Sequence, residues 1–425
     1  MSQYPGTAAL TQRMLMALAL SVCLMGLSGT AWAQTVEFIY PEPAGLGFND
    51  PTPATPVGGN PGTTVGDQRR IAIELAGQIW SNIVLATQTV RVRAVFGALT
   101  CDANSAVLGS ASPQGIFSDF GGAAQPDTWY VSALADTLGN SDREPDEVDL
   151  RANFNRNIDN NNACLSGRSW YYGLDSNPPG NDIDFLNTVM HEIGHGLGFL
   201  SLVNVTTGAL PSSRPTIFDR FAFDGSQGLY LSDMTDAQRR DAVRAGSNLV
   251  FDGGRTNLFA QSKWQSGFGS GGFTRLYAPN TVRPGSTLSH FDTSASPNAL
   301  MEPFLSGSLR STRDVDLTAN FMADIGWSIA DIDEDLVTDV NDNCVTTPNV
   351  DQFNGDADDF GNACDADLDG DGTVNIVDLG LLRQRFFSAD PAADLNGDGV
   401  VNIVDLGRMR VAFFRAPGPT GLVFP

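Results

Sequence analysis

One short segment, His191-Glu192-Ile193-Gly194-His195, restricts the possible folds of this chain more than any other feature. Its two histidines are four residues apart, so on a helix both imidazoles project from one face and can share a metal ion. Apolar residues cluster on the opposite face of the same helix, namely Leu186, Val189, Ile193 and Leu197. The pattern predicts a helix that is buried on one side and presents metal ligands on the other.

The histidine content indicates the remaining ligand of such a site. The chain has three histidines, and the third is His290. A zinc peptidase site needs three protein ligands and leaves the fourth position for water, so His290 is the natural third ligand and a carboxylate is the alternative. Glu192 lies about 60° around the helix from His195, where it can reach a metal-bound water without binding the metal. We therefore expect one catalytic zinc ion on His191, His195 and His290, with Glu192 as general base.

The longer sequence from His191 to Phe199 resembles the active-site helix of the metzincin zinc metallopeptidases. In that family the helix ends at a glycine, here Gly198, and the third histidine usually follows three residues later, where this chain has Ser201. A subgroup that resembles leishmanolysin has a long insertion before the third histidine, and that arrangement fits His290 better. The resemblance implies an insertion at about residues 200–289, whose role the sequence does not indicate.

Two further blocks carry the same resemblance. Residues 298–303 resemble the Met-turn beneath the metal, with Met301 eleven residues after His290. Residues 324–327 resemble the end of such catalytic domains. The resemblance covers roughly residues 36–327 and implies an α+β catalytic domain with an active-site helix and a mixed sheet.

The sequence between these blocks predicts further elements of an α+β fold. Apolar spacing predicts a helix at about residues 67–83, and alternation predicts a strand with one solvated face at residues 90–96. Shorter strands are expected at residues 129–131 and 170–172, helices at 235–245 and 314–325, and a glycine-rich loop at 266–272.

The N-terminus has the pattern of an export signal. Arg13 supplies a positive charge, residues 14–27 form an apolar stretch, and an Ala-x-Ala cleavage motif at residues 31–33 precedes Gln34. The apolar stretch is shorter than the about 20 residues of a membrane span, and no later stretch reaches that length. We expect residues 1–33 to be a signal peptide and the mature protein to be secreted, without a transmembrane segment.

Four cysteines remain after the signal peptide, and an even number in an exported protein predicts two disulfide bonds. Three pairings are possible, and proximity along the sequence favours Cys101–Cys164 and Cys344–Cys364. The alternative is free buried thiols.

The composition changes sharply after Trp327. Residues 331–405 contain eighteen Asp and one Glu against two Arg, a net charge of about −17, and carboxylates this dense repel one another unless cations are bound. A loop with oxygen donors at the spacing of a calcium loop, and with glycine at its sixth position, occurs twice at an interval of 27 residues. The expected calcium ligands are Asp367, Asp369, Asp371, Thr373, Asn375 and Asp378 in the first loop and Asp394, Asn396, Asp398, Val400, Asn402 and Asp405 in the second.

The two loops resemble a dockerin domain, because the last ligand of each is Asp and an apolar helical stretch follows, at residues 379–387 and 406–414. A dockerin implies a cohesin partner on a scaffold or cell surface; the alternative is a calcium-stabilised fold without a cohesin. Upstream, residues 331–365, which include Cys344 and Cys364, resemble a thrombospondin type 3 repeat. Such repeats are held together by calcium and a disulfide, so the resemblances imply several structural calcium ions.

The expected domain order is a signal peptide (1–33), a zinc metallopeptidase domain (34–330), a thrombospondin type 3-like calcium repeat (331–366), a dockerin-like domain (367–417) and a tail (418–425). We expect a secreted zinc endopeptidase with protein or peptide substrates and a possible cohesin-type scaffold partner. The formal charge of −24 argues against binding to nucleic acid. The alternatives are a calcium-dependent adhesive or scaffold-bound protein with an inactive peptidase-like domain, and a zinc hydrolase that acts on a non-peptide bond.

Overall fold

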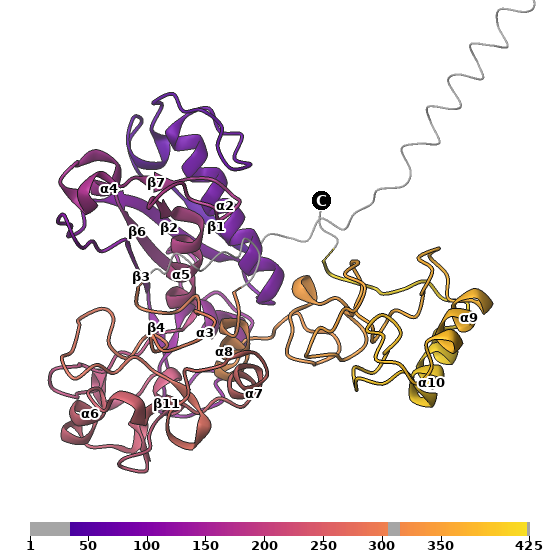
Figure 1. Ribbon diagram of the computed structural model, residues 1–425. Helices are drawn as coiled ribbons and strands as arrows, with labels where there is room; N and C mark the ends of the chain where they lie inside the picture. The colour runs from indigo at the N-terminus through magenta and orange to yellow at the C-terminus, as the bar shows by residue number, and fades with distance from the viewer. Residues whose placement is uncertain (1–34, 305–314, 423–425) are drawn as a thin grey trace, which may run out of the picture. The chain divides into compact units, whose positions relative to one another are not determined.

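The computed structural model describes residues 35–304 and 315–422 (Figure 1). The expected signal peptide and its cleavage site before Gln34 lie outside the described residues. The described chain mixes helices with sheets, as the expected α+β class requires. Residues 35–330 are called the N-terminal part below, and residues 331–422 the C-terminal part. Among the described helices, none has the length and apolar character that crossing a membrane demands.

The α-helices are α2 (Val65–Ile83), α3 (Ser132–Gly139), α4 (Asn157–Asn160), α5 (Phe185–Leu197), α6 (Asp236–Ala242), α7 (Gly254–Lys263), α8 (Thr318–Ile325), α9 (Ile376–Gln384) and α10 (Ile403–Ala412). The strands are β1 (Val36–Ile39), β2 (Val90–Gly97), β3 (Gly109–Pro113), β4 (Ile116–Phe117), β5 (Tyr130–Val131), β6 (Leu150–Asn155), β7 (Trp170–Tyr171), β8 (Ile183–Asp184), β9 (Ala222–Asp224), β10 (Leu229–Tyr230), β11 (Leu249–Phe251) and β12 (Thr274–Arg275).

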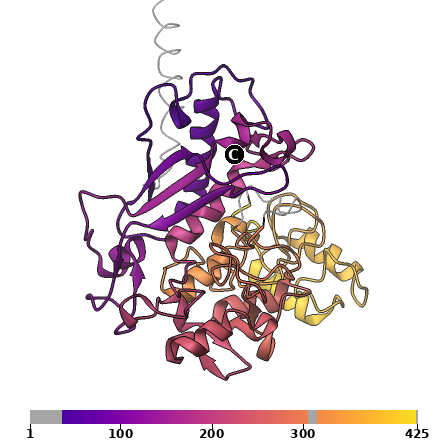
Figure 2. The ribbon, with the colours of Figure 1, turned by 90° about the vertical axis from the view of Figure 1, so that its left-hand side faces the viewer.

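The main sheet has the strand order β1-β2-β6-β3, in which β1, β2 and β6 are parallel and β3 is antiparallel to β6 (Figure 2). Strand β2 is the strand expected at residues 90–96, and its alternating residues are buried and half-buried in turn. Strand β3 forms one edge of the sheet and pairs with β6 alone among the described strands. This mixed sheet therefore has a free edge at β3.

Helices α2 and α5 pack against each other and against the main sheet. The indole Nε1 of Trp80, a fully buried residue of α2, donates to the carbonyl oxygen of Met190 in α5 at 3.0 Å. Helix α2 begins two residues before the expected residue 67, because Thr64 caps it by accepting a hydrogen bond from the Asp67 N–H. The helix expected around His191 and His195 is α5, and its apolar face is buried as expected.

The insertion at residues 200–289 contains a second, antiparallel sheet with the order β10-β9-β11-β12. It also contributes to a buried aromatic cluster made of Phe199, Phe218, Phe251, Phe291 and Phe321. At the other end of α5, its first residue, Phe185, contacts Phe48 of the 3₁₀ turn Gly47–Asn49 and two rings of the main sheet, Phe96 and Phe154. Helix α5 thus lies between two groups of aromatic rings within one continuous hydrophobic core.

Several expected boundaries were wrong, and local backbone contacts explain the differences. The helix expected at 235–245 is α6, which starts after the capping residue Thr235 and ends at Ala242. The helix expected at 314–325 starts only at Thr318, because Asp316 has a left-handed backbone (φ 49°) and its carboxylate accepts from the Thr318 N–H. The strands expected at 129–131 and 170–172 lose Trp129 and Tyr172, since their partners β4 and β8 have only two residues each.

In the C-terminal part, α9 and α10 begin three residues before the expected positions 379 and 406. The preceding asparagines, Asn375 and Asn402, start the helices by capping them. Neither helix reaches its expected end, because Phe387 and Phe414 have left-handed backbones with φ of 62°. The glycine-rich loop at 266–272 contains a 3₁₀ turn at Ser270–Gly272 and isolated β-bridges at Ser266 and Phe268.

Both expected disulfide bonds are present. Cys101 pairs with Cys164 in the N-terminal part, and Cys344 pairs with Cys364 in the C-terminal part.

Candidate metal centre

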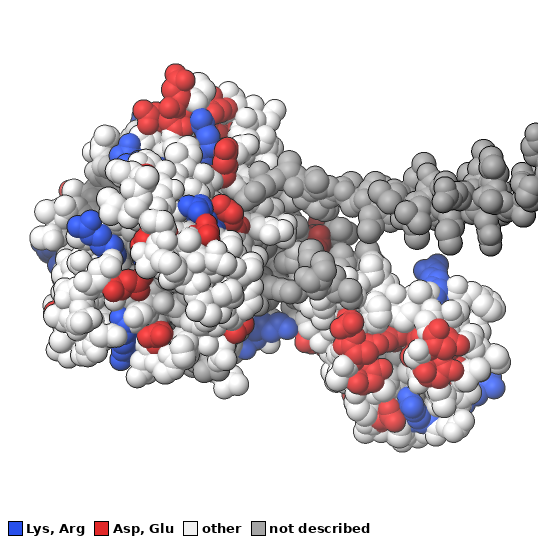
Figure 3. All heavy atoms as spheres, turned by 90° about the horizontal axis from the view of Figure 1, so that it is seen from above, with Lys and Arg blue, Asp and Glu red and all other residues white. Residues whose placement is uncertain are grey.

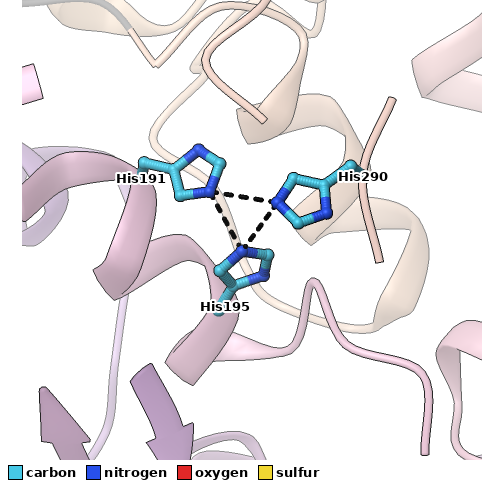
Figure 4. Close-up of side chains that lie close together, drawn as sticks. All are labelled: His191, His195 and His290. Atoms are coloured by element: carbon cyan, nitrogen blue, oxygen red, sulfur yellow. Dashed lines mark hydrogen bonds between the residues drawn. The ribbon is translucent and has the colours of Figure 1, made fainter. Parts of the chain in front are cut away.

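The three histidines of the chain converge on one point. The Nε2 atoms of His191 and His195 are 3.0 Å apart, and the Nε2 atom of His290 lies 3.2 Å from each of them (Figure 4). Helix α5 supplies the first two, whereas the third comes from the segment that follows the insertion. His195 and His290 are buried, with 8% and 4% of their surface exposed.

The other ring nitrogen of each histidine contacts a backbone carbonyl. The Nδ1 atoms of His191, His195 and His290 lie 2.7–2.8 Å from the carbonyl oxygens of Leu300, Phe199 and Ser286, respectively. A carbonyl oxygen can only accept a hydrogen bond, so each Nδ1 carries the proton and each Nε2 is left with a lone pair. The three Nε2 atoms therefore have no proton to share, and their lone pairs repel unless a cation lies among them.

This arrangement fits zinc. A tetrahedral site with zinc–nitrogen distances of about 2.0–2.1 Å places its ligand nitrogens roughly 3.3 Å apart, close to the separations found here. Carbonyl acceptors on the outer nitrogen are the usual way in which a metal-binding imidazole is oriented. Burial lowers the pKa of all three histidines, and for His195 and His290 the neighbouring imidazoles lower it further, to about 3 for His195. The rings are thus neutral at pH 7, as a metal ligand must be.

Glu192 lies beside this centre on the same helix and is 6% exposed. Burial raises the pKa of its carboxyl to about 8, and a hydrogen bond from the Ala111 N–H of β3 opposes that shift. Its carboxylate also lies against Gly109, where a β-carbon would stand 2.6 Å from Oε1. Strand β3 therefore fixes the position of the proposed general base.

Met301 is fully buried beneath the histidine-bearing turn of α5. A β-carbon on Gly194 would lie 2.7 Å from its sulfur, so glycine at that position permits the close approach. Gly198 ends the helix with φ of 128°, a conformation that side chains rarely adopt, and this turn directs the chain into the insertion. Glycine at position 194 therefore allows Met301 to approach the helix, and glycine at position 198 allows the helix to end in this conformation.

Ser201 occupies the position where the resembled family usually has its third histidine, and here it connects the helix to the His290 segment. Its N–H donates to the Ser289 hydroxyl at 3.0 Å, and its own hydroxyl donates to Asp219 at 2.5 Å. Asp219 is fully buried and also accepts from the Thr216 N–H. Both ends of the insertion are therefore held together next to His290.

The two calcium loops of the C-terminal part share four equivalent hydrogen bonds, and the first loop has two more. In the first, the Asp367 carboxylate accepts from the backbone N–H groups of residues 370–372, and Asp378 accepts from Leu368, Asp369 and Asn375. In the second, Asp394 accepts from Asp398 and Gly399, and Asp405 from Asn396 and Asn402. The first and last acidic residue of each loop are buried, while Asp371 and Asp398 are exposed.

Two further expected calcium ligands, Asn375 and Asn402, each use both side-chain polar atoms in hydrogen bonds. Asn375 and Asn402 cap α9 and α10 through their side-chain oxygens, and their amide nitrogens donate to the carbonyls of Thr373 and Val400. Ligand atoms lie within 4.8 Å of one another in three acidic groups: Asp367/Asp369/Asp378, Asp331/Asp333/Asp335 and Asp356/Asp358/Asp365. In Figure 3, acidic side chains gather on the lobe that carries α9 and α10 in Figure 1.

Comparison with known families supports the C-terminal modules. Residues 365–412 match the dockerin type I domain, and residues 330–352 match the thrombospondin type 3 repeat. The C-terminal part thus contains two modules of kinds that bind calcium. No curated protein and no solved structure matches the chain.

Sequence reasoning missed several residues around the histidines. Ser289 has no sequence pattern that singles it out, and Gly109 and Ala111 lie in a strand of small residues without apolar alternation. The carbonyls of Leu300, Phe199 and Ser286 carry no sequence signal, because any residue has a carbonyl. Asp219 and Arg220 are charged residues within the otherwise apolar residues 217–222, and an acid in such a place is a sequence clue to a buried hydrogen-bonding role.

Proposed function

We propose that the N-terminal part is a metzincin-like zinc endopeptidase. The observation that carries the proposal is the set of three unprotonated Nε2 atoms, each fixed by a carbonyl on its other nitrogen, beside the buried carboxylate of Glu192. The buried Met301 beneath α5 adds support, since the resembled family has a methionine at that place.

In this mechanism His191, His195 and His290 would hold the ion, and Glu192 would accept and then donate the proton. Zinc would supply a Lewis acid and lower the pKa of a bound water to about 7. Glu192 takes the proton of the attacking water as general base and then delivers it to the leaving amine. The Ala111 N–H keeps the carboxylate oriented during both transfers.

The free edge of β3 is the natural binding place for an extended peptide. Strand β3 passes next to Glu192, and its outer side pairs with no strand among the described residues. A peptide that adds to this edge would use main-chain hydrogen bonds, which favour a polypeptide over other acyl compounds. The proposed substrate class is therefore a protein or peptide in an extended conformation.

The test combines zinc analysis with casein digestion. Wild type should bind one zinc and cleave casein, Glu192→Gln should bind zinc without cleaving, and His290→Ala should lose zinc. Glu37→Gln, an exposed glutamate on β1, is the matched control and should behave as wild type. Zinc-loaded wild type that cleaves no peptide bond would contradict peptidase function and favour a non-peptide substrate or an inactive domain. Unchanged cleavage by Glu192→Gln would refute the mechanism.

We further propose that the protein is exported and that its dockerin domain attaches it to a cohesin-bearing scaffold. The dockerin match carries this proposal, and both repeats expose the same apolar residues at equivalent positions: Ile376 and Ile403, Val377 and Val404, Phe387 and Phe414. Exposed apolar residues in such numbers are typical of a protein-binding surface.

Titration calorimetry with a type I cohesin domain in calcium tests this attachment. We expect binding by wild type and loss of binding in a variant that carries both Ile376→Asp and Ile403→Asp. No heat of binding with wild type would favour a calcium-stabilised module without a cohesin partner.

A further inference from the structure

The chain that leaves the N-terminal part is fixed to it by backbone and side-chain hydrogen bonds. The Trp327 indole donates to the carbonyl of Leu197, the last residue of α5, at 2.8 Å. Residues 328–330 then run beside the end of α2. There the Leu85 N–H donates to the carbonyl oxygen of Ser328, and the Ala330 N–H donates to the carbonyl oxygen of Ile83. The acidic segment therefore begins directly at the surface that supports the metal-binding helix.

The first acidic group after this junction is Asp331, Asp333 and Asp335, whose oxygens lie within 4.8 Å of one another. The side chain of Asp331 is only 3% exposed, and its Oδ1 has no hydrogen-bond partner. The Oδ2 of Asp333 is likewise buried without a partner. Buried carboxylate oxygens without a hydrogen-bond partner are costly unless a cation binds them, and hard oxygen ligands suit calcium.

The segment that carries this group, residues 331–336, is bonded to helices α7 and α8 of the N-terminal part. The Oδ2 of Asp331 pairs with the guanidinium of Arg255, in the first turn of α7. That turn donates its N–H groups at Arg255 and Thr256 to the Asp324 carboxylate of α8, at 3.0 and 2.9 Å. From α8, the Asn320 amide donates to the carbonyl of Leu336 at 2.9 Å.

We propose that calcium in the Asp331/Asp333/Asp335 group stabilises the N-terminal part itself, through Arg255 and Asn320. Without the cation the three carboxylates repel one another, and residues 331–336 no longer hold both partners in place. Helix α8 then loses a fixed neighbour, and its Phe321 packs on Phe199, whose carbonyl orients His195. The proposal does not depend on catalysis, and it assigns this calcium a role separate from that of the dockerin loops.

Tryptophan fluorescence can isolate the effect, because every tryptophan of the chain lies at or before Trp327. Metal-free full-length protein is reloaded with one equivalent of zinc, and its thermal unfolding is followed with and without millimolar calcium. At a calcium concentration 100 times the dissociation constant, mass action predicts that the midpoint rises by roughly 5–10 °C.

Three variants separate this group from the rest. Asp333→Asn should abolish the calcium-induced rise, and Arg255→Met should at least halve it. Arg240→Met, which removes an exposed guanidinium on α6, should leave it unchanged. A chain with Asp367→Asn and Asp394→Asn in the dockerin loops should also retain the rise.

Asn320→Ala, which keeps both the acidic group and Arg255, should reduce the rise even if Arg255→Met does not fold. The proposal fails if calcium leaves the tryptophan midpoint of wild type unchanged or if Asp333→Asn keeps the full rise. It also fails if the dockerin-loop variant loses the rise.

Discussion

Replacement of Phe321 by alanine should destabilise the N-terminal part more than any loss of a surface contact. Phe321 of α8 is fully buried, and its ring lies 4.1 Å from that of Phe199 and 4.5 Å from that of Phe251 between centroids. Buried Phe→Ala changes cost about 3–5 kcal/mol, and the lost ring–ring contacts add about 0.5–1.5 kcal/mol each. The two ring contacts together add about 1–3 kcal/mol, so we expect a loss of about 4–8 kcal/mol in the free energy of unfolding.

The assay is guanidinium unfolding of the full chain, followed by tryptophan fluorescence so that only the N-terminal part is observed. Phe387→Ala is the matched control, since that ring is 85% exposed and its removal should change stability by about 0.5 kcal/mol or less. Phe321→Leu should lie between the two. A loss below about 1.5 kcal/mol for Phe321→Ala would refute the assignment of Phe321 to the core.

The same variant tests the connection to the metal site. Phe321 contacts Phe199, whose carbonyl oxygen accepts from His195, and Phe291, which directly follows His290 in the chain. Folded Phe321→Ala protein should therefore bind zinc more weakly than wild type in a competition titration, whereas Phe387→Ala should not.

Three further predictions follow from other contacts. Gly109→Ala should displace the Glu192 carboxylate and lower kcat by about 10- to 100-fold with zinc retained, whereas Gly121→Ala, where nothing lies within 4 Å, should leave kcat unchanged. Replacing both Cys101 and Cys164 by serine opens a loop that spans 63 residues and should cost about 2–4 kcal/mol in chemical unfolding; no loss would contradict a structural role. Burial raises the pKa of Asp149 to about 6, because the fold accommodates the neutral carboxyl better than the carboxylate. The free energy of unfolding therefore falls as the pH rises from about 4 through 6. Asp149→Asn should therefore gain about 1–3 kcal/mol over wild type at pH 8 and little at pH 4; an equal gain at both pH values would refute this reading.

The features that the sequence predicts well are those with a local pattern. The apolar residues on the buried face of α5 recur every three or four residues, and the calcium loop recurs after 27 residues. In both cases the spacing alone indicates the structure. His290 was placed by the scarcity of histidine, and its Nε2 does lie with those of the other two.

The features that the sequence did not predict depend on distant partners. Strand β3 consists of Gly109, Ser110, Ala111, Ser112 and Pro113, whose small side chains leave room for Glu192 but give no apolar alternation. The strands of the insertion are two or three residues long, too short for periodicity to reveal. The pairing of Arg255 with Asp331 joins residues 76 apart, and only the fold brings them together.

The contacts of residues 327–330 affect the order in which the chain folds. The carbonyl of Leu197, at the end of α5, accepts from the indole of Trp327, which is synthesised 130 residues later. Val84, just after α2, pairs with Ile329, which is still more distant in sequence. At synthesis rates of about 5–20 residues per second, the first of these intervals is on the order of ten seconds. Contacts this distant in sequence also slow the search for the native state. The histidine-bearing helix therefore reaches its final surroundings only after the end of the N-terminal part has been made.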